Sequence, residues 1–121
     1  MKKIYYNKLI RDKIPERIRR SGGDYKVRTL GQKSFCRELI KKVGEEADGL
    51  LSAKNKKELI FELADVIDVI DEIKRIEKIK DSQIRMAQKE NFLKKGGFKK
   101  KIYLIWSSDT GYKTNERRYK K

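Results

Sequence analysis

Apolar residues recur three and four positions apart in the central part of the chain, over residues 32–53 and again over residues 57–76. This spacing predicts two helices with one apolar side each, although Gly44 and Gly49 lie inside the first. The break at residues 54–56 (KNK) is short, which predicts an antiparallel helical hairpin. The apolar positions are Phe35, Leu39, Ile40, Val43, Ala47, Leu50 and Leu51, followed by Leu59, Leu63, Val66, Ile67, Ile70 and Ile73.

Weaker patterns precede the hairpin. Residues 8–20 form a short amphipathic segment that is closed by residues 21–23 (SGG), and Pro15 is expected in its first helical turn. Residues before Pro15 are therefore expected to be extended. Residues 25–30 alternate weakly between apolar and polar, which predicts either a short strand or an extended linker.

After the hairpin, a further helix is expected over residues 81–95, and Gly96 and Gly97 are expected to end it as a C-cap. Residues 101–106 (KIYLIW) are rich in β-forming side chains and predict a short strand or a docking segment. The remaining residues, 107–121, are polar and basic and are expected to form a mobile tail.

Composition narrows the fold class. With 121 residues, of which 37% are hydrophobic and 42% charged, we expect one domain over residues 1–106 followed by the basic tail. The fold is expected to be all-α: the hairpin forms a four-helix core by homodimerisation, with short extended segments near the termini. No apolar run approaches the ~20 residues that cross a bilayer, so a cytoplasmic protein without membrane contact is expected.

The chain contains no histidine and one cysteine, Cys36. It therefore has no disulfide within the chain, no Cys/His zinc site and no histidine-based nucleophile activation. Any catalysis must use carboxylates, Lys or Arg side chains, hydroxyls and bound metal ions.

The net charge of +15 is unevenly distributed. Residues 1–37 carry 12 basic and 3 acidic groups, residues 38–77 carry 7 and 11, and residues 78–121 carry 14 and 4. An acidic centre between basic flanks suits Mg²⁺ and a small polyphosphate at least as well as a nucleic acid. Solvated helix faces remain the simpler interpretation for most of the lysines.

Helical wheels at roughly 100° per residue place acidic residues on one shoulder of each central helix. With Val43 at zero, Glu46 lies at about −60° and Glu45 at about −160°; with Leu59 at zero, Glu62 lies at about −60° and Asp65 at about −120°, while Asp68 points away near 180°. Carboxylates spaced this way repel one another unless solvent or a cation intervenes. A divalent cation between the helices, Mg²⁺ or Mn²⁺, would resolve this, and the alternative is an ordinary solvated flank.

These residues also carry a family resemblance. Residues 45–49 (EEADG) and, twelve residues later, 62–65 (ELAD) resemble the EExxE…ExxD pattern of the MazG-like all-α nucleoside triphosphate pyrophosphohydrolases, which include phosphoribosyl-ATP pyrophosphohydrolase. Residues 6–15 (YNKLIRDKIP) and 95–98 (KGGF) resemble a small single-domain, house-cleaning branch of that superfamily. The resemblance covers about residues 5–106.

The resemblance implies a metal-dependent hydrolase that splits a nucleoside triphosphate into the monophosphate and pyrophosphate. It implies Glu46, Glu62 and Asp65 as metal ligands, and it implies that Gly49 replaces a family glutamate, a gap that Glu45 or a water could fill. We expect Glu45 or Glu62 to be the catalytic base. The expected substrate-binding residues are Lys8, Arg11, Asp12, Lys13, Lys89 and Lys95.

Individual roles differ within that substrate-binding set. Arg11 is suited to grip phosphate with two donors, and Asp12 is expected to orient Arg11 or Lys13. Plain surface charge is an equally good interpretation of Lys13, and Lys89 and Lys95 are weaker candidates.

Two other functions compete with hydrolysis. Gly49 suggests a catalytically weakened relative that binds or senses nucleotides. The charge of +15 and the aromatic residues Tyr103, Trp106, Tyr112 and Tyr119 suggest a nucleic-acid-binding protein, although no known recognition motif accompanies them.

Overall fold

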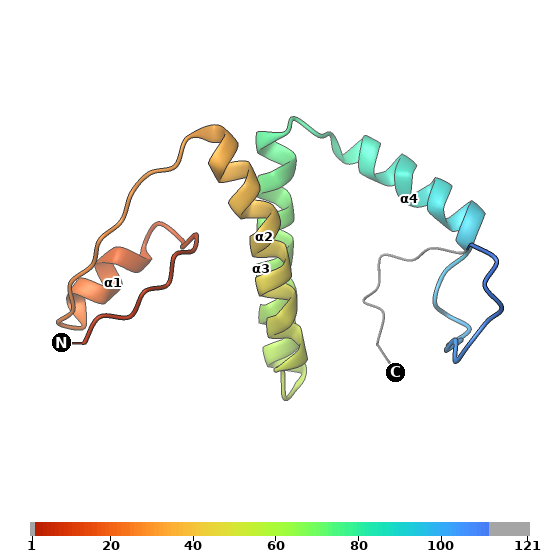
Figure 1. Cartoon of the computed structure of the whole chain (residues 1–121), viewed down its shortest axis with the longest axis horizontal. Helices are drawn as coiled ribbons and strands as arrows, with labels where there is room; N and C mark the ends of the chain where they lie inside the picture. Colours follow the sequence, from red (N-terminus) through yellow and green to blue (C-terminus); the bar gives the residue numbers. More distant parts are fainter. Residues whose placement is uncertain (1, 112–121) are drawn as a thin grey trace. The chain divides into compact units, whose positions relative to one another are not determined.

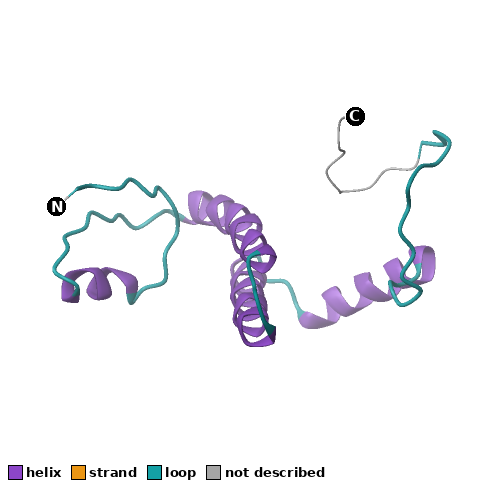
Figure 2. Ribbon diagram, turned by 90° about the horizontal axis from the view of Figure 1, so that it is seen from below, coloured by secondary structure: helices purple, strands orange, loops and turns teal. Residues whose placement is uncertain are grey.

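A computed structural model describes residues 2–111 of the chain. They contain four helices, α1 (Ile14–Arg20), α2 (Gln32–Leu51), α3 (Lys56–Ile76) and α4 (Asp81–Lys95), and no strand (Figure 1). Figure 2 shows only helices and loops along the described part of the chain. The predicted all-α class is therefore confirmed.

α1 is shorter than the amphipathic segment that contains it. Pro15 lies in its first turn, where a missing backbone N–H costs nothing, and residues 8–13 precede the helix. The helix ends at Ser21, and the Gly23 N–H donates to the Ile18 carbonyl at 3.0 Å. Residues 25–30 form no strand, so the linker interpretation of this segment is the correct one.

α2 and α3 form the predicted hairpin and lie side by side in both views (Figures 1 and 2). Asn55 ends the short connection and caps α3, because its side-chain oxygen accepts the Glu58 N–H at 2.9 Å. The Glu58 carboxylate in turn accepts from the Asn55 amide at 3.1 Å and from the Lys54 N–H at 3.3 Å. This reciprocal cap fixes where the chain reverses.

The hairpin covers only part of its apolar side chains. Within residues 2–111, Leu39 on α2 is the one hydrophobic residue classed as buried, with 5% of its surface exposed. On α3, Val66 and Ile73 are half-buried. The rest of the predicted core of α3 is exposed, because one partner helix covers only one stripe of a wide apolar face. The exposed members are Leu59, Leu63, Ile67 and Ile70.

α4 matches its predicted bounds, and it ends as expected at Gly96, which has a φ of +76° and donates to the Phe92 carbonyl at 2.8 Å. Residues 101–106 form no strand, so that alternative is wrong, and their apolar side chains are exposed. The chain divides into two compact units between Ile84 and Arg85. No helix in the described range is long and apolar enough to span a membrane.

Part of the predicted tail, residues 112–121 with Tyr112 and Tyr119, lies outside the described residues.

Candidate functional site

Three carboxylates from the two hairpin helices converge at one place. Glu46 on α2 and Glu62 and Asp65 on α3 each offer an oxygen, and these oxygens all lie within 4.8 Å of one another. All three residues are half-buried. The three residues proposed from the sequence as metal ligands are therefore neighbours in the fold, and together they can hold a metal ion.

Gly49 lies directly opposite Glu62. A Cβ built at position 49 would clash with the Glu62 Oε2 atom and lie 3.2 Å from its Cδ atom. Position 49 therefore faces the carboxylate cluster, and glycine at this point leaves room for the Glu62 side chain to reach between the helices. The clash involves the end of a flexible side chain, so a larger residue at position 49 requires Glu62 to move rather than the backbone.

Glu45 is held by two lysines and is not part of the cluster. The Lys8 and Lys42 ammonium groups lie 3.0 and 3.1 Å from its Oε1 atom. Burial tends to raise the pKa of Glu45, but the two hydrogen bonds and the positive charges of Lys8 and Lys42 outweigh it and lower that pKa. The charged form of Glu45 is therefore favoured, and Glu45 is a weaker proton acceptor than an ordinary glutamate.

Lys42 links the N-terminal segment to the acidic residues. Its side chain is only 16% exposed, and the ammonium donates to the Leu9 carbonyl at 2.9 Å and lies 3.6 Å from the Glu46 Oε1 atom. Lys42 was not among the predicted site residues, although it precedes Glu46 by four positions and so shares its side of α2.

Arg11 bridges two aspartates of α3. Its Nη2 atom lies 2.9 Å from Asp65 Oδ1 and 2.9 Å from Asp68 Oδ2. The hydrogen bond to Asp68 and the charges of both aspartates raise the pKa of Arg11 against the opposing effect of burial. Asp68, which the wheel places near 180°, is 55% exposed, and Arg11 connects it to Asp65 of the carboxylate cluster.

Four other predicted substrate-binding residues are exposed: Asp12, Lys13, Lys89 and Lys95. Within residues 2–111, no ion pair joins Asp12 to Arg11 or to Lys13, and the orienting role expected for Asp12 stays a prediction. Lys13 is the exposed N-cap residue of α1. Lys89 and Lys95 are exposed residues of α4 that belong to the second compact unit.

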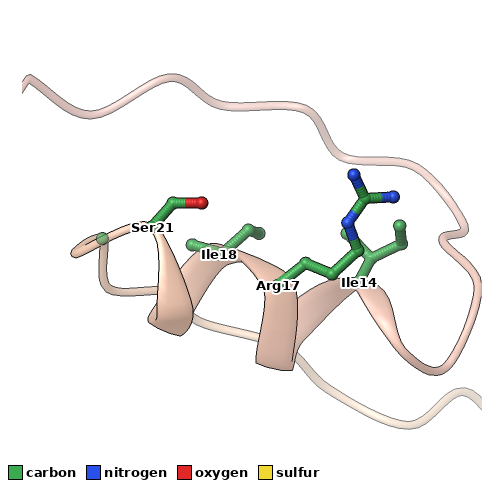
Figure 3. Close-up of a pocket in the computed structure, with 5 residues that line it drawn as sticks. Ile14, Arg17, Ile18 and Ser21 are labelled. Carbon is green, nitrogen blue, oxygen red and sulfur yellow. The ribbon is translucent and has the colours of Figure 1, made fainter.

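A separate hollow lies beside α1 and contains none of the acidic residues. It is lined by the side chains of Ile14, Arg17, Ile18 and Ser21, shown along the helix in Figure 3, and by Gly23. The hollow is open and mainly apolar, and we assign no chemistry to it.

A comparison of the sequence with family models finds no match, and comparisons with curated proteins and with solved structures find no significant match.

Proposed function

We propose that the protein hydrolyses a nucleoside triphosphate, canonical or noncanonical, to the monophosphate and pyrophosphate with the help of a divalent cation. The observation that carries this proposal is the convergence of Glu46, Glu62 and Asp65 within 4.8 Å. These are the residues at which the chain resembles the metal ligands of the MazG-like pyrophosphohydrolases. The packing of two helices does not by itself bring carboxylates together. The convergence of carboxylates at these three positions therefore supports the proposal.

The donor set suits Mg²⁺ or Mn²⁺, because hard cations prefer carboxylate oxygens and keep further positions for water and phosphate. A bound cation of this kind would neutralise phosphate charge and make a water more acidic. Glu46, Glu62 and Asp65 would hold it. Because the chain contains no histidine, we expect a carboxylate to accept the proton from the attacking water.

Of the two candidate bases, we favour Glu62. The lowered pKa of Glu45 makes it a poorer proton acceptor, and its carboxylate is already engaged by Lys8 and Lys42. The Glu62 carboxylate instead fills the room beside Gly49, where the family pattern has a further carboxylate. Lys8, Lys42 and Arg11 place positive charge around the cluster, which favours an anionic substrate.

A nucleotide-binding or sensing role is the second candidate, and Gly49 supports it. Because position 49 faces Glu62, the glycine removes a potential ligand at the cluster itself and not at a remote site. Such a protein would bind Mg²⁺ and nucleotide but release little or no pyrophosphate.

We further propose a homodimer formed through the exposed apolar residues of the hairpin. Ile67 of α3 is 53% exposed, and Ile40 of α2 is 60% exposed. A second hairpin would cover such residues and complete a four-helix core.

The test is a panel of canonical and modified nucleoside triphosphates assayed for pyrophosphate release with Mg²⁺, with Mn²⁺ and with chelator. Hydrolysis predicts metal-dependent release from at least one nucleotide. Metal-dependent nucleotide binding without pyrophosphate release would favour the sensing role. A chain that binds neither Mg²⁺ nor nucleotide would contradict both the hydrolytic and the sensing role.

A further inference from the structure

Arg11 pairs with two carboxylates, of which one belongs to the acidic cluster of Glu46, Glu62 and Asp65 and the other does not. Its Nη2 atom lies 2.9 Å from an oxygen of Asp65 and 2.9 Å from an oxygen of Asp68. Asp65 belongs to the cluster with Glu46 and Glu62, whereas Asp68 does not. The two aspartates are three residues apart on α3 and so lie about one helical turn from each other.

Asp65 cannot serve a divalent cation and Arg11 equally well. A carboxylate that binds a dication has less negative charge to offer a guanidinium, and the two cations repel each other. Asp68 makes no such compromise, because it is outside the cluster and 55% exposed. When a metal occupies the cluster, Asp68 is therefore the anchor that Arg11 retains.

Arg11 has donors to spare for a ligand. Both aspartates are bound through the single atom Nη2, and within residues 2–111 the Nη1 and Nε groups make no hydrogen bond. The side chain is 60% exposed. A planar guanidinium with free donors beside a metal site is suited to the oxygens of a phosphate chain.

We propose that Asp68 is a positioning residue that keeps Arg11 beside the acidic cluster when a divalent cation binds there, so that Arg11 contacts the pyrophosphate portion of the substrate. This inference rests on the proposed function, because it assigns a role in holding the phosphates of the same substrate. Asp68 acts through Arg11 and touches neither metal nor substrate.

The test measures binding of Mg²⁺ alone and then of inorganic pyrophosphate in saturating Mg²⁺, both by calorimetry on the full chain. The variants are Asp68→Asn, Arg11→Gln and the double variant, and Asp71→Asn is the matched control because Asp71 lies one turn further along α3 and pairs with Lys74. Asp68→Asn should leave Mg²⁺ affinity within about twofold and weaken pyrophosphate binding roughly three- to tenfold, as Arg11→Gln does. The double variant should be no weaker than Arg11→Gln, and Asp71→Asn should match the parent.

Three results would overturn the inference. They are pyrophosphate binding in Asp68→Asn equal to that of the parent, a further loss of binding when Asp68→Asn is added to Arg11→Gln, and a loss of Mg²⁺ affinity in Asp68→Asn such as a metal ligand would show. In a protein that hydrolyses nucleotides, Asp68→Asn should raise KM with little change in kcat, and Asp68→Glu should restore part of the loss. If the parent chain binds no Mg²⁺, the proposed function fails first; if it binds Mg²⁺ and releases pyrophosphate while Asp68→Asn is silent, only this inference fails.

Discussion

The two sides of the α2–α3 hairpin differ in how many of their side chains are contacted by other residues of the same chain. On the wheels, Glu46, Gly49, Glu62 and Asp65 all lie at about −60° to −120°, whereas the exposed Ile67 lies at about 80°. Antiparallel helices present matching sides of their wheels to the same side of a hairpin, so Glu46, Glu62 and Asp65 share one face, and the exposed Ile40 and Ile67 share the opposite face. We refer to these as the acidic face and the apolar face.

The acidic face finds its partners within the chain. Lys8, Leu9 and Arg11 connect the N-terminal segment to both helices through Glu45, Lys42 and the aspartates of α3, at distances of 2.9 to 3.0 Å. Within the described residues, the apolar face has no comparable cover, and Leu63 and Ile67 remain exposed. Charge pairing therefore organises the acidic face within one chain, whereas apolar side chains on the opposite face stay exposed in the described residues.

The largest expected effect comes from removing ligands on the acidic face. Asp65→Asn and Glu62→Gln should abolish metal-dependent turnover while the fold persists, because each replaces a charged oxygen donor on a helix shoulder. Mg²⁺ binding measured by calorimetry should fall together with the rate. Glu38→Gln, which removes a carboxylate of α2 that pairs with Lys41, is the control and should keep parental activity. Parental turnover in Asp65→Asn would show that the site assignment is wrong.

The apolar face should respond to charge and not to metal. Sedimentation at micromolar concentration should show about twice the 14.4 kDa chain mass, and Ile67→Glu should reduce it to the monomer by placing a charge in the proposed interface. Leu93→Glu places the same charge on an exposed apolar residue of α4 and should leave the mass unchanged. A monomeric parent chain would remove the dimer proposal.

Gly49→Glu tests whether the acidic face lacks one metal-binding carboxylate at position 49. The added carboxylate should raise Mg²⁺ affinity and any hydrolysis rate, because position 49 faces Glu62. Helix propensity adds up to about 1 kcal/mol, offset without metal by repulsion from Glu45, Glu46 and Glu62, so the gain in thermal stability should appear mainly with Mg²⁺.

Gly49→Gln is the control for Gly49→Glu, because it adds a side chain of the same size beside Glu62 without the carboxylate. It should bring the propensity gain without a gain in metal affinity. Weaker Mg²⁺ binding in Gly49→Glu would mean that the glycine belongs to a differently built site.

The smallest expected effect concerns pH. The folded protein lowers the pKa of Glu45 below its usual 4.5, so the ion pairs with Lys8 and Lys42 stabilise the fold above that pH and are lost as the pH falls through the lowered pKa. Because the Lys8 and Glu45 side chains are 42% and 40% exposed, Lys8→Gln should cost under about 1 kcal/mol in denaturant unfolding at pH 7. The difference from the parent should shrink at acidic pH; an equal cost at both pH values would contradict an electrostatic origin.

Much of the hairpin and its acidic cluster could be predicted from the sequence, because both depend on local periodicity. Glu46, Glu62 and Asp65 fall on matching shoulders by helical geometry alone, and α4 begins and ends at its predicted residues. The Arg11–Asp68 pair could not be predicted in this way, since 57 residues separate its members and only the path of the N-terminal segment brings them together.

The exposure of Leu59 and Ile70 could not be predicted from the helical wheel either. Apolar spacing identifies a face that prefers burial, but it does not say which neighbour covers each part of that face. The β-forming residues 101–106 were misleading for a related reason, because strand formation requires a pairing partner that the described chain does not supply.

The most direct test of the proposed function is phosphorus NMR of the full chain incubated with Mg²⁺ and a nucleoside triphosphate that the panel identifies. Hydrolysis at the acidic face predicts that nucleoside monophosphate and pyrophosphate signals grow together, and that chelator or Asp65→Asn stops both. Release of orthophosphate with a nucleoside diphosphate, or product formation that survives chelator, would contradict it.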